Sequence, residues 1–240
     1  MKAHNVQIII LAAGKGSRMK SDLPKPMHKI AGRTMLEMVL ENARCVSDDI
    51  TIVYSEAMRP YLDDAAARLV IQPTPLGTGH AVYCAIDAIN PEKPTIVLCA
   101  DNPFIDAGMI TSMLDAFKIS NSDMMVMAFE REDPTGYGRL VLDDQNKVKK
   151  IIECKDANSQ EKSITLCNSG IILFNSKALK EALLELMAHK SSGEYYLTSL
   201  LEIAYNNGYK TGYFTASGAV PLGVNTPEEL EAAQKLKNFS

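Results

Sequence analysis

The sequence predicts an α/β fold with a mostly parallel sheet, helices on both faces and a small inserted β-ribbon lobe. Three observations predict it. Short β-rich runs alternate with amphipathic segments of helical length up to about residue 130. The runs Gln7–Leu11 and Thr95–Ala100 are almost wholly apolar, as in strands that are buried on both faces of a parallel sheet. Two β-rich stretches then interrupt the alternation before it resumes near residue 170.

The first half of the chain supplies most of the expected sheet. Strands are expected at Gln7–Leu11, Ile50–Tyr54, Leu69–Ile71, Thr95–Ala100 and Met124–Phe129. Helices are expected at Thr34–Arg44, at Met58–Ala67, at Thr78–Ile89 and from Asp106 to Phe117. The helix at Thr34 has a clear start, because Thr34 and Glu37 have capping-box spacing ahead of an apolar stripe.

The second half contains the lobe and then returns to the α/β pattern. Between residues 131 and 167, the stretches Arg139–Leu142 and Val148–Glu153 flank a polar turn, which predicts a β-ribbon. A strand at Gly170–Phe174, helices at Ser176–His189 and Tyr195–Tyr205, and a strand at Thr211–Thr215 are expected after it. Thr226, Pro227 and Glu229 mark the start of a last helix. Without a linker-like tract, residues 1–240 are predicted to form one domain with a lobe at about 131–167.

Composition and charge exclude several classes of protein. No apolar run approaches the ~20 residues that a membrane helix needs, and the short apolar stretch near the N-terminus is a poor signal peptide. Five cysteines without C-x-x-C spacing argue against a disulfide framework and a zinc site. A net charge of −4 gives no reason to expect nucleic acid as a partner. We therefore expect a cytoplasmic protein that has no membrane or nucleic-acid partner.

The N-terminal segment nevertheless carries a strong local positive charge. Residues 1–33 hold seven lysines and arginines against a single acidic residue, although the chain as a whole is acidic. Such an asymmetry indicates a local anionic ligand rather than a polyanion that lies along the surface.

The loop after the first strand has the chemistry that a triphosphate requires. Residues 11–19 read LAAGKGSRM and follow the first strand at its carboxyl end, where open α/β sheets bind ligands. Its glycines let backbone N–H groups approach a phosphate, and Arg18 and Lys25 add positive charge. A dinucleotide fingerprint is excluded because Met19 replaces its third glycine, and the P-loop sequence is absent. The alternative is an ordinary turn with solvated lysines.

Other polar residues are candidates on their own chemistry. Asp101 follows a buried strand, and Asp106 is the better helix cap, so Asp101 is free for a cation. Gln72 offers both a donor and an acceptor to a base. Glu153 suits sugar hydroxyls, and Tyr137 lies between two glycines, where its ring can lie along a sugar. The alternatives are a polar strand-end residue for Gln72 and a solvated strand-end carboxylate for Glu153. Asn168, beside Gly170, could orient an acyl amide, and its alternative is a simple turn.

Taken together, these motifs resemble the nucleotide-diphospho-sugar transferase family. The string at residues 11–25 is accompanied by LGTGHA at 76–81, DPTGYGR at 133–139, NSG at 168–170, GEYYLT at 193–198 and GVN at 223–225. In this order they look like the pyrophosphorylase domain of the bacterial N-acetylglucosamine-1-phosphate uridylyltransferases. The resemblance spans nearly the whole chain and implies a Rossmann-like fold.

The resemblance implies a role for each matching position. Arg18 would contact the leaving phosphates and the transition state, and Lys25 would contact the nucleotide phosphates. Asp101 and Asn225 would be the protein ligands of Mg²⁺, the expected cofactor. The remaining matching positions would bind substrate: Leu11, Ala12, Ala13 and Gly14 on the uracil and phosphate side, Gln72, Gly77 and Thr78 at the uracil, and Gly138, Glu153 and Asn168 at the sugar, with Tyr137 and Thr198 counted among them.

The implied reaction is transfer of a uridylyl group from UTP to N-acetylglucosamine-1-phosphate, which gives pyrophosphate and UDP-N-acetylglucosamine, a cell-wall precursor. The sequence departs from the family at Cys99-Ala100 and at Asn102, beside the metal aspartate. The methyl group of Ala100 is expected near the metal and the sugar, which leaves the sugar open. The alternatives are a nucleotidyltransferase for another sugar-1-phosphate or alcohol phosphate, and a non-catalytic sugar-nucleotide-binding subunit.

The bacterial relatives usually continue into a left-handed β-helix that acetylates glucosamine-1-phosphate and forms a trimer. Such a helix has six-residue repeats, and residues 206–240 show none. We therefore expect uridylyl transfer without the β-helix acetyltransferase domain, in a monomer or small homo-oligomer rather than a trimer.

Overall fold

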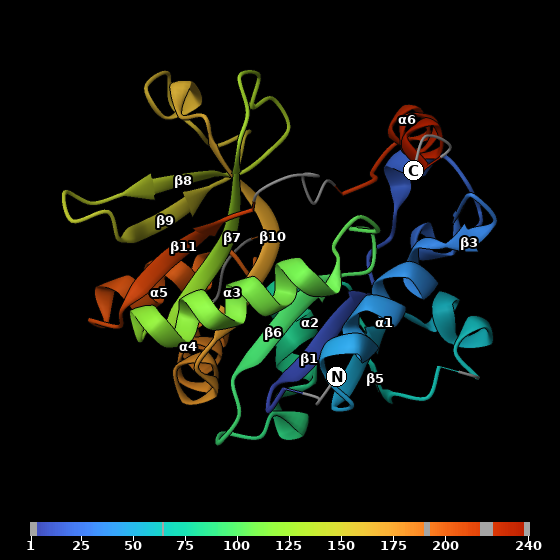
Figure 1. Cartoon of the computed structure of the whole chain (residues 1–240), viewed down its shortest axis with the longest axis horizontal. Coiled ribbons are helices and arrows are strands. Elements are labelled where there is room, and N and C mark those ends of the chain that lie inside the picture. The colour runs from blue at the N-terminus through green and yellow to red at the C-terminus, as the bar shows by residue number, and fades with distance from the viewer. Residues whose placement is uncertain (1–3, 64, 190–192, 217–222, 238–240) are drawn as a thin grey trace.

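A nine-stranded sheet organises the chain (Figure 1). The computed structural model describes residues 4–63, 65–189, 193–216 and 223–237. Seven strands form the main path of the sheet in the order β11-β7-β10-β6-β1-β4-β5. Their bounds are β1 Gln7–Ala12, β4 Ile50–Tyr54, β5 Arg68–Ile71, β6 Thr95–Cys99, β7 Met124–Glu130, β10 Leu166–Phe174 and β11 Thr211–Thr215. All pair in parallel except β10, which is antiparallel to β6 and β7.

Helices cover both faces of this sheet, as expected. One face carries α1 (Met35–Val46) and α3 (Ala107–Ser120), and the other carries α2 (Thr78–Cys84), α4 (Ser176–Ala188) and α5 (Ser199–Asn206). Among the described residues, no helix is both long and apolar enough to cross a membrane.

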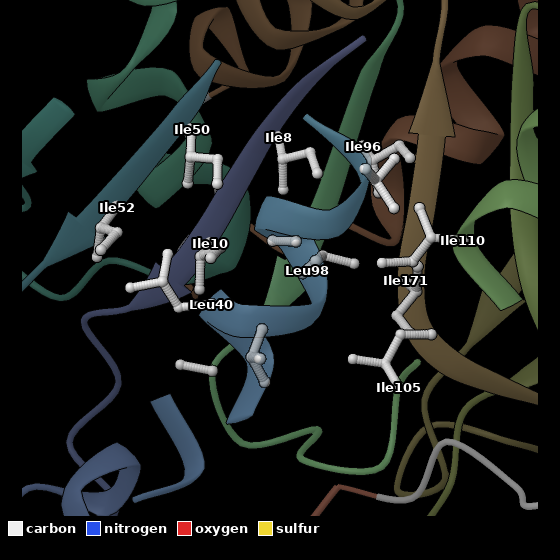
Figure 2. Packing of buried hydrophobic residues seen from close by; sticks show 14 of the residues in the cluster. Ile8, Ile10, Leu40, Ile50, Ile52, Ile96, Leu98, Ile105, Ile110 and Ile171 are labelled. Atoms are coloured by element: carbon white, nitrogen blue, oxygen red, sulfur yellow. The ribbon is translucent and has the colours of Figure 1, made fainter. Parts of the chain in front are cut away.

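The central strand β1 is buried along its whole length because both of its faces are covered. Side chains alternate between the two faces of a strand. Ile8 and Ile10 therefore enter the core beneath α1 and α3, whereas Ile9 and Leu11 enter the core beneath α2 and α4. Figure 2 shows Ile8 and Ile10 packed with Leu40 of α1. The all-apolar sequence of β1 is explained by this two-sided burial.

A third, smaller core brings the C-terminal helix back to the N-terminal segment. The short strands β2 (Lys29–Ile30) and β3 (Arg33–Thr34) form a hairpin, and α6 (Pro227–Lys237) packs against it. This core consists of Ile30, Met35, Met38, Val224 and Ala233. The packing of this core places residues 223–225 at the edge of the sheet where β1 ends.

The predicted lobe is present as a β-ribbon. Strands β8 (Arg139–Leu142) and β9 (Val148–Ile152) pair in antiparallel fashion, and β8 joins the main sheet through the pairing of Arg139 with Cys167. A 3-10 turn at Glu161–Ser163 completes the insertion before β10. The predicted fold class, including the lobe, is confirmed.

Three helix predictions need correction, and the strand expected at Gly170–Phe174 begins earlier, at Leu166. The helix expected at Met58–Ala67 is a 3-10 segment at Glu56–Tyr61, because Pro60 removes a backbone donor; residue 64 is outside the described residues. The helix expected at Thr78–Ile89 ends at Cys84 and tightens into a 3-10 turn at Ile86–Ala88. The helix expected from Tyr195 begins at Ser199, because the Tyr195 backbone pairs with Leu76 and Gly79 instead.

Candidate functional site

The largest concentration of the predicted site residues lies where the strand order of the sheet reverses. Chain order proceeds from β1 towards β4 and β5 on one side, and β6 lies on the other side of β1. Loops that follow β1 and β6 therefore diverge and leave a crevice at the carboxyl ends of these strands. The backbone N–H of Ala100 donates to the Leu11 carbonyl at 3.0 Å, so the two strands stay hydrogen-bonded to one another up to the bottom of this crevice.

A cavity of about 420 Å³ occupies this position. Eleven of the predicted site residues line it: Leu11, Ala12, Ala13, Gly14, Arg18, Lys25, Gln72, Gly77, Thr78, Asp101 and Asn225. They come from five separate segments of the chain. The parallel arrangement of β1, β5 and β6 brings the loops after these strands to one edge, whereas Asn225 reaches it through the packing of α6.

The glycine loop is shaped for close approach of a ligand. A Cβ atom on Gly14 would meet nothing within 4 Å, so the space above this backbone is open. At Gly16, φ is +60° and a Cβ atom would lie 2.7 Å from Cβ of Lys25, so only glycine lets Lys25 pack this closely. Met19 is only 3% exposed and anchors the loop. Met19, which stands where a dinucleotide fingerprint has its third glycine, is therefore part of the packing beneath this loop.

Four polar side chains converge on one point in the cavity. Lys25 forms an ion pair with Asp101, and its Nζ donates to Oδ1 of Asn225 at 2.6 Å. Arg18 donates from Nη2 to the same Oδ1 at 2.9 Å. These contacts join residues that are up to 207 positions apart in sequence. The two predicted metal ligands and the two predicted catalytic cations thus form one cluster.

The donor set of this cluster fits Mg²⁺. A carboxylate oxygen of Asp101 and the amide oxygen of Asn225 both lie within hydrogen-bonding distance of the Lys25 ammonium, so two oxygens converge on one cationic group. Mg²⁺ prefers oxygen ligands and takes few of them from protein. The described residues include no group of three or more histidine, cysteine or acidic side chains that could hold a metal. Water and phosphate oxygens would have to supply the other ligands.

The helix cap of α6 places Asn225. The backbone N–H of Glu229 donates to Oγ1 of Thr226 at 3.2 Å, and the Glu229 carboxylate accepts from the backbone N–H of Asn225 at 2.5 Å. The N–H of Val224 also donates to the Asp101 carbonyl at 2.8 Å. The predicted cap of the last helix is therefore part of the site, because it holds one candidate ligand next to the other.

The structure explains both departures from the family pattern. Ala100 is 1% exposed and belongs to the core beneath α1 and α3, so its methyl group points away from the cavity; the expectation that it lies near the sugar is wrong. Asn102 is 3% exposed and donates from Nδ2 to the Ser169 carbonyl at 2.8 Å. An apolar residue could not make this bond, which ties the Asp101 loop to the strand that carries Asn168.

Cys99 lines the cavity but is not suited to act as a nucleophile. Burial and, secondarily, the Asp101 carboxylate raise the pKa of its thiol to about 12. The thiolate is the reactive form of cysteine, so this side chain stays neutral and unreactive at physiological pH.

The opposite wall of the cavity is a rigid contact between two loops. The backbone N–H of Tyr195 donates to the Leu76 carbonyl at 2.8 Å. The Tyr195 carbonyl in turn accepts from the backbone N–H of Gly79 at 2.7 Å. Oγ1 of Thr78 accepts from the Leu197 N–H at 2.9 Å, so this hydroxyl is engaged in holding the loop.

Gly77→Ala is expected to destabilise the protein by roughly 2–4 kcal/mol, because φ at Gly77 is +110° and an added Cβ atom would lie 2.5 Å from the Tyr195 carbonyl oxygen. Urea unfolding of the two proteins would measure the loss. Gly208→Ala is the matched control, since Gly208 also has a positive φ, +79°, but has nothing within 4 Å of an added Cβ. Equal losses of unfolding free energy in both variants would show that the contact between the two loops contributes nothing to stability.

Five residues expected to bind substrate do not line the cavity and lie towards the lobe: Tyr137, Gly138, Glu153, Asn168 and Thr198. Four of them form contacts in two pairs. Thr198 donates from Oγ1 to Glu153 at 3.1 Å, and the Asn168 N–H donates to the Gly138 carbonyl at 2.8 Å. The Tyr137 ring packs edge-on against Phe129, with centroids 5.1 Å apart.

The Asn168 side chain has a structural role in this region. Its Oδ1 accepts from the Gly170 N–H at 2.9 Å, at the point where the pairing of β10 with β7 shifts register. Gly170 has a φ of +83° there. The turn interpretation and the substrate-binding prediction for Asn168 are compatible, because its Nδ2 takes no part in this bond.

Several cavity residues are not predicted from the sequence, of which Glu194 and Tyr196 are the most informative. Both belong to the GEYYLT motif, in which Thr198 alone is a predicted site residue. Lys155 donates from Nζ to the Tyr196 hydroxyl at 3.1 Å and so joins the cavity to the lobe. The other missed residues lining the cavity are Lys15, Gly16, Ser17, Pro26, Pro75, Ala81 and Cys99.

Comparison with known proteins adds independent information. Residues 8–203 match the family described as MobA-like NTP transferase domain. The bifunctional protein GlmU of Clostridioides difficile (strain 630) is 40% identical over 237 residues, which are 97% of this chain and 51% of the relative. GlmU of Lactococcus lactis subsp. cremoris (strain MG1363) is 41% identical over 199 residues, which are 81% of this chain and 43% of the relative. The chain spans about half the length of these curated relatives.

A solved structure from Bacillus anthracis, named as a candidate glucose-1-phosphate thymidylyltransferase in complex with sucrose, has a similar fold. Its TM-score is 0.79 at 22% sequence identity, and the match covers 96% of this chain and 94% of that one. The similarity supports the open, mostly parallel sheet described above.

Proposed function

The chain belongs to the family of MobA-like NTP transferase domains, and we propose that it transfers a uridylyl group from UTP to N-acetylglucosamine-1-phosphate and releases pyrophosphate. The observation that carries the proposal is the convergence of Arg18, Lys25, Asp101 and Asn225 at the strand edge. Relatives named GlmU at about 40% identity support the choice of reaction. A non-catalytic binding subunit would need the glycine loop but not all four of these side chains.

The cluster would act by positioning and by neutralising charge. In the proposed reaction, an oxygen of the sugar phosphate attacks the α-phosphorus of UTP in line, and the bond to pyrophosphate breaks. Arg18 and Lys25 would bind phosphate oxygens, and Arg18 would stabilise the negative charge that builds on the departing pyrophosphate. Asp101 and Asn225 would hold Mg²⁺, which when bound supplies further neutralisation of phosphate charge. No covalent intermediate is required.

The rest of the cavity would select the two substrates. Leu11 to Gly14 would lie against the nucleotide, and Gln72, Gly77 and Thr78 would contact the uracil. Gly138, Glu153 and Asn168, with Tyr137 and Thr198, would hold the sugar at the lobe side. The hydrogen bond from Asn102 to the Ser169 carbonyl supports this placement of the two substrates. It links the loop of Asp101, a proposed metal ligand, to the strand that bears Asn168.

UTP is expected to be preferred over CTP by roughly 5- to 150-fold in kcat/KM, because cytosine would leave a buried polar group of the base site unpaired. Gln72 is only 5% exposed, so a base bound against it would leave little room for water to replace the lost partner. Pyrophosphate release would be measured with each of the four NTPs and a panel of sugar-1-phosphates. Equal use of CTP would reject the uracil assignment, and a preference for another sugar-1-phosphate or an alcohol phosphate would reject the acceptor assignment.

A further inference from the structure

The side-chain amide of Gln72 is held in one orientation by its first hydrogen bond. Its Nε2 lies 3.0 Å from the carbonyl oxygen of Gly77. A backbone carbonyl can only accept, so the atom that faces it must be the NH₂ group and not the amide oxygen. Gly77 is itself held by the loop of Tyr195, so this acceptor does not move freely.

The second contact of the same nitrogen assigns the tautomer of a histidine. Nδ1 of His80 lies 2.9 Å from Nε2 of Gln72. An amide nitrogen only donates, so Nδ1 must accept, and the imidazole must be neutral with its hydrogen on Nε2. Burial lowers the pKa of His80, which agrees with the neutral form.

With both amide hydrogens engaged, Gln72 presents only an acceptor to a ligand, which corrects the expectation that it offers a donor as well. Gln72 lines the cavity, and among the described residues no donor to its Oε1 is found. The N3 atom of uracil carries a hydrogen that such an oxygen can accept, whereas N3 of cytosine carries a lone pair that would repel it. An amide free to rotate by 180° would suit both bases.

We propose that His80 is a positioning residue for base selection: it accepts from Nε2 of Gln72, keeps Oε1 towards the nucleotide base and so favours uracil over cytosine. The inference rests on the proposed function and deepens it. His80 is not among the residues that line the cavity, so it acts through Gln72 and not by touching the base. Its place on α2 is fixed by the hydrogen bond from Gly79 N–H to Tyr195.

Two substitutions separate the acceptor from the packing of the ring. His80→Phe keeps an aromatic ring and removes the acceptor, whereas His80→Asn can place its Oδ1 near the position of Nδ1. Cys84→Ala is the control for the other polar neighbour of the ring, because Sγ of Cys84, one turn along α2, lies 3.9 Å from Nδ1 and 3.8 Å from Nε2 of His80. The dissociation constants of UTP and CTP would be measured by calorimetry, and kcat/KM with each nucleotide by pyrophosphate release.

His80→Phe is expected to reduce the ratio of UTP to CTP affinity by about 5- to 10-fold, mainly by improving CTP binding, while His80→Asn and Cys84→Ala keep the ratio within about twofold. An unchanged ratio in His80→Phe would overturn the inference while leaving the proposed function intact. A wild-type protein without any preference for UTP would instead reject the proposed function and this inference together.

The tautomer can be read in the wild-type protein even if the phenylalanine variant does not fold. Nitrogen-15 NMR of the imidazole is expected to show hydrogen on Nε2 and none on Nδ1 at neutral pH. A hydrogen on Nδ1 would overturn the inference, since Nδ1 could then not accept from Gln72, and this result is independent of which substrate the enzyme uses.

Discussion

Arg18→Ala is expected to lower kcat by roughly 10²–10³-fold and to change the KM for UTP much less. Negative charge grows on the pyrophosphate as it departs, so a guanidinium beside it contributes more to the transition state than to the bound substrate. Arg18 donates to Oδ1 of Asn225, which turns its guanidinium towards the cluster that also contains Lys25. The arginine therefore already points towards the cluster before a phosphate arrives.

Steady-state kinetics with varied UTP would separate the effect on kcat from the effect on KM. Arg33→Ala is the matched control: it removes a second guanidinium from the same basic N-terminal segment, but Arg33 pairs with Glu41 at the surface and does not line the cavity. Arg18→Lys is expected to recover only part of the loss, because an ammonium lacks the forked donor geometry. An unchanged kcat in Arg18→Ala would remove Arg18 from the reaction.

Most of the fold was predictable because the local signals agree with the tertiary structure. The apolar run of β1 and the capping box of Thr34 and Glu37 both appear as expected. Local patterns predicted the wrong boundary where contacts with a distant part of the chain determine the backbone conformation. Residues 195–198 have helical spacing, yet the backbone of Tyr195 bonds to Leu76 and Gly79 from a distant loop, and the helix begins only at Ser199.

The residues of the candidate site are indicated by the sequence in a different way. Spacing after a strand is enough to indicate Asp101, and the glycine loop is enough to indicate Arg18 and Lys25. No local pattern shows that Asn225 meets them, because its position depends on the packing of α6 against the hairpin of β2 and β3. The partnership of Gln72 with His80 is likewise a matter of side-chain geometry, although the two residues are only eight positions apart.

Asp101→Ala and Asn225→Ala are each expected to lower the rate by roughly 10²-fold at fixed magnesium concentration and to raise the magnesium concentration needed for half-maximal activity. Both oxygens lie within hydrogen-bonding distance of the Lys25 ammonium, so they are close enough to each other to share one cation. Magnesium titrations of activity, together with direct calorimetry of magnesium binding in the presence of UTP, would measure the two effects separately.

The double variant decides whether the two residues serve a single cation. If they do, its loss should be little greater than that of the more damaged single variant, because residues that act as one unit are not additive. Each substitution also removes a partner of Lys25, and Asn225→Ala removes the acceptor of Arg18, so the coupling should extend to these cations. Asp106→Asn is the control, since Asp106 caps α3 through the Met109 N–H and lies outside the cavity. Losses that simply add in the double variant would mean that Asp101 and Asn225 do separate work.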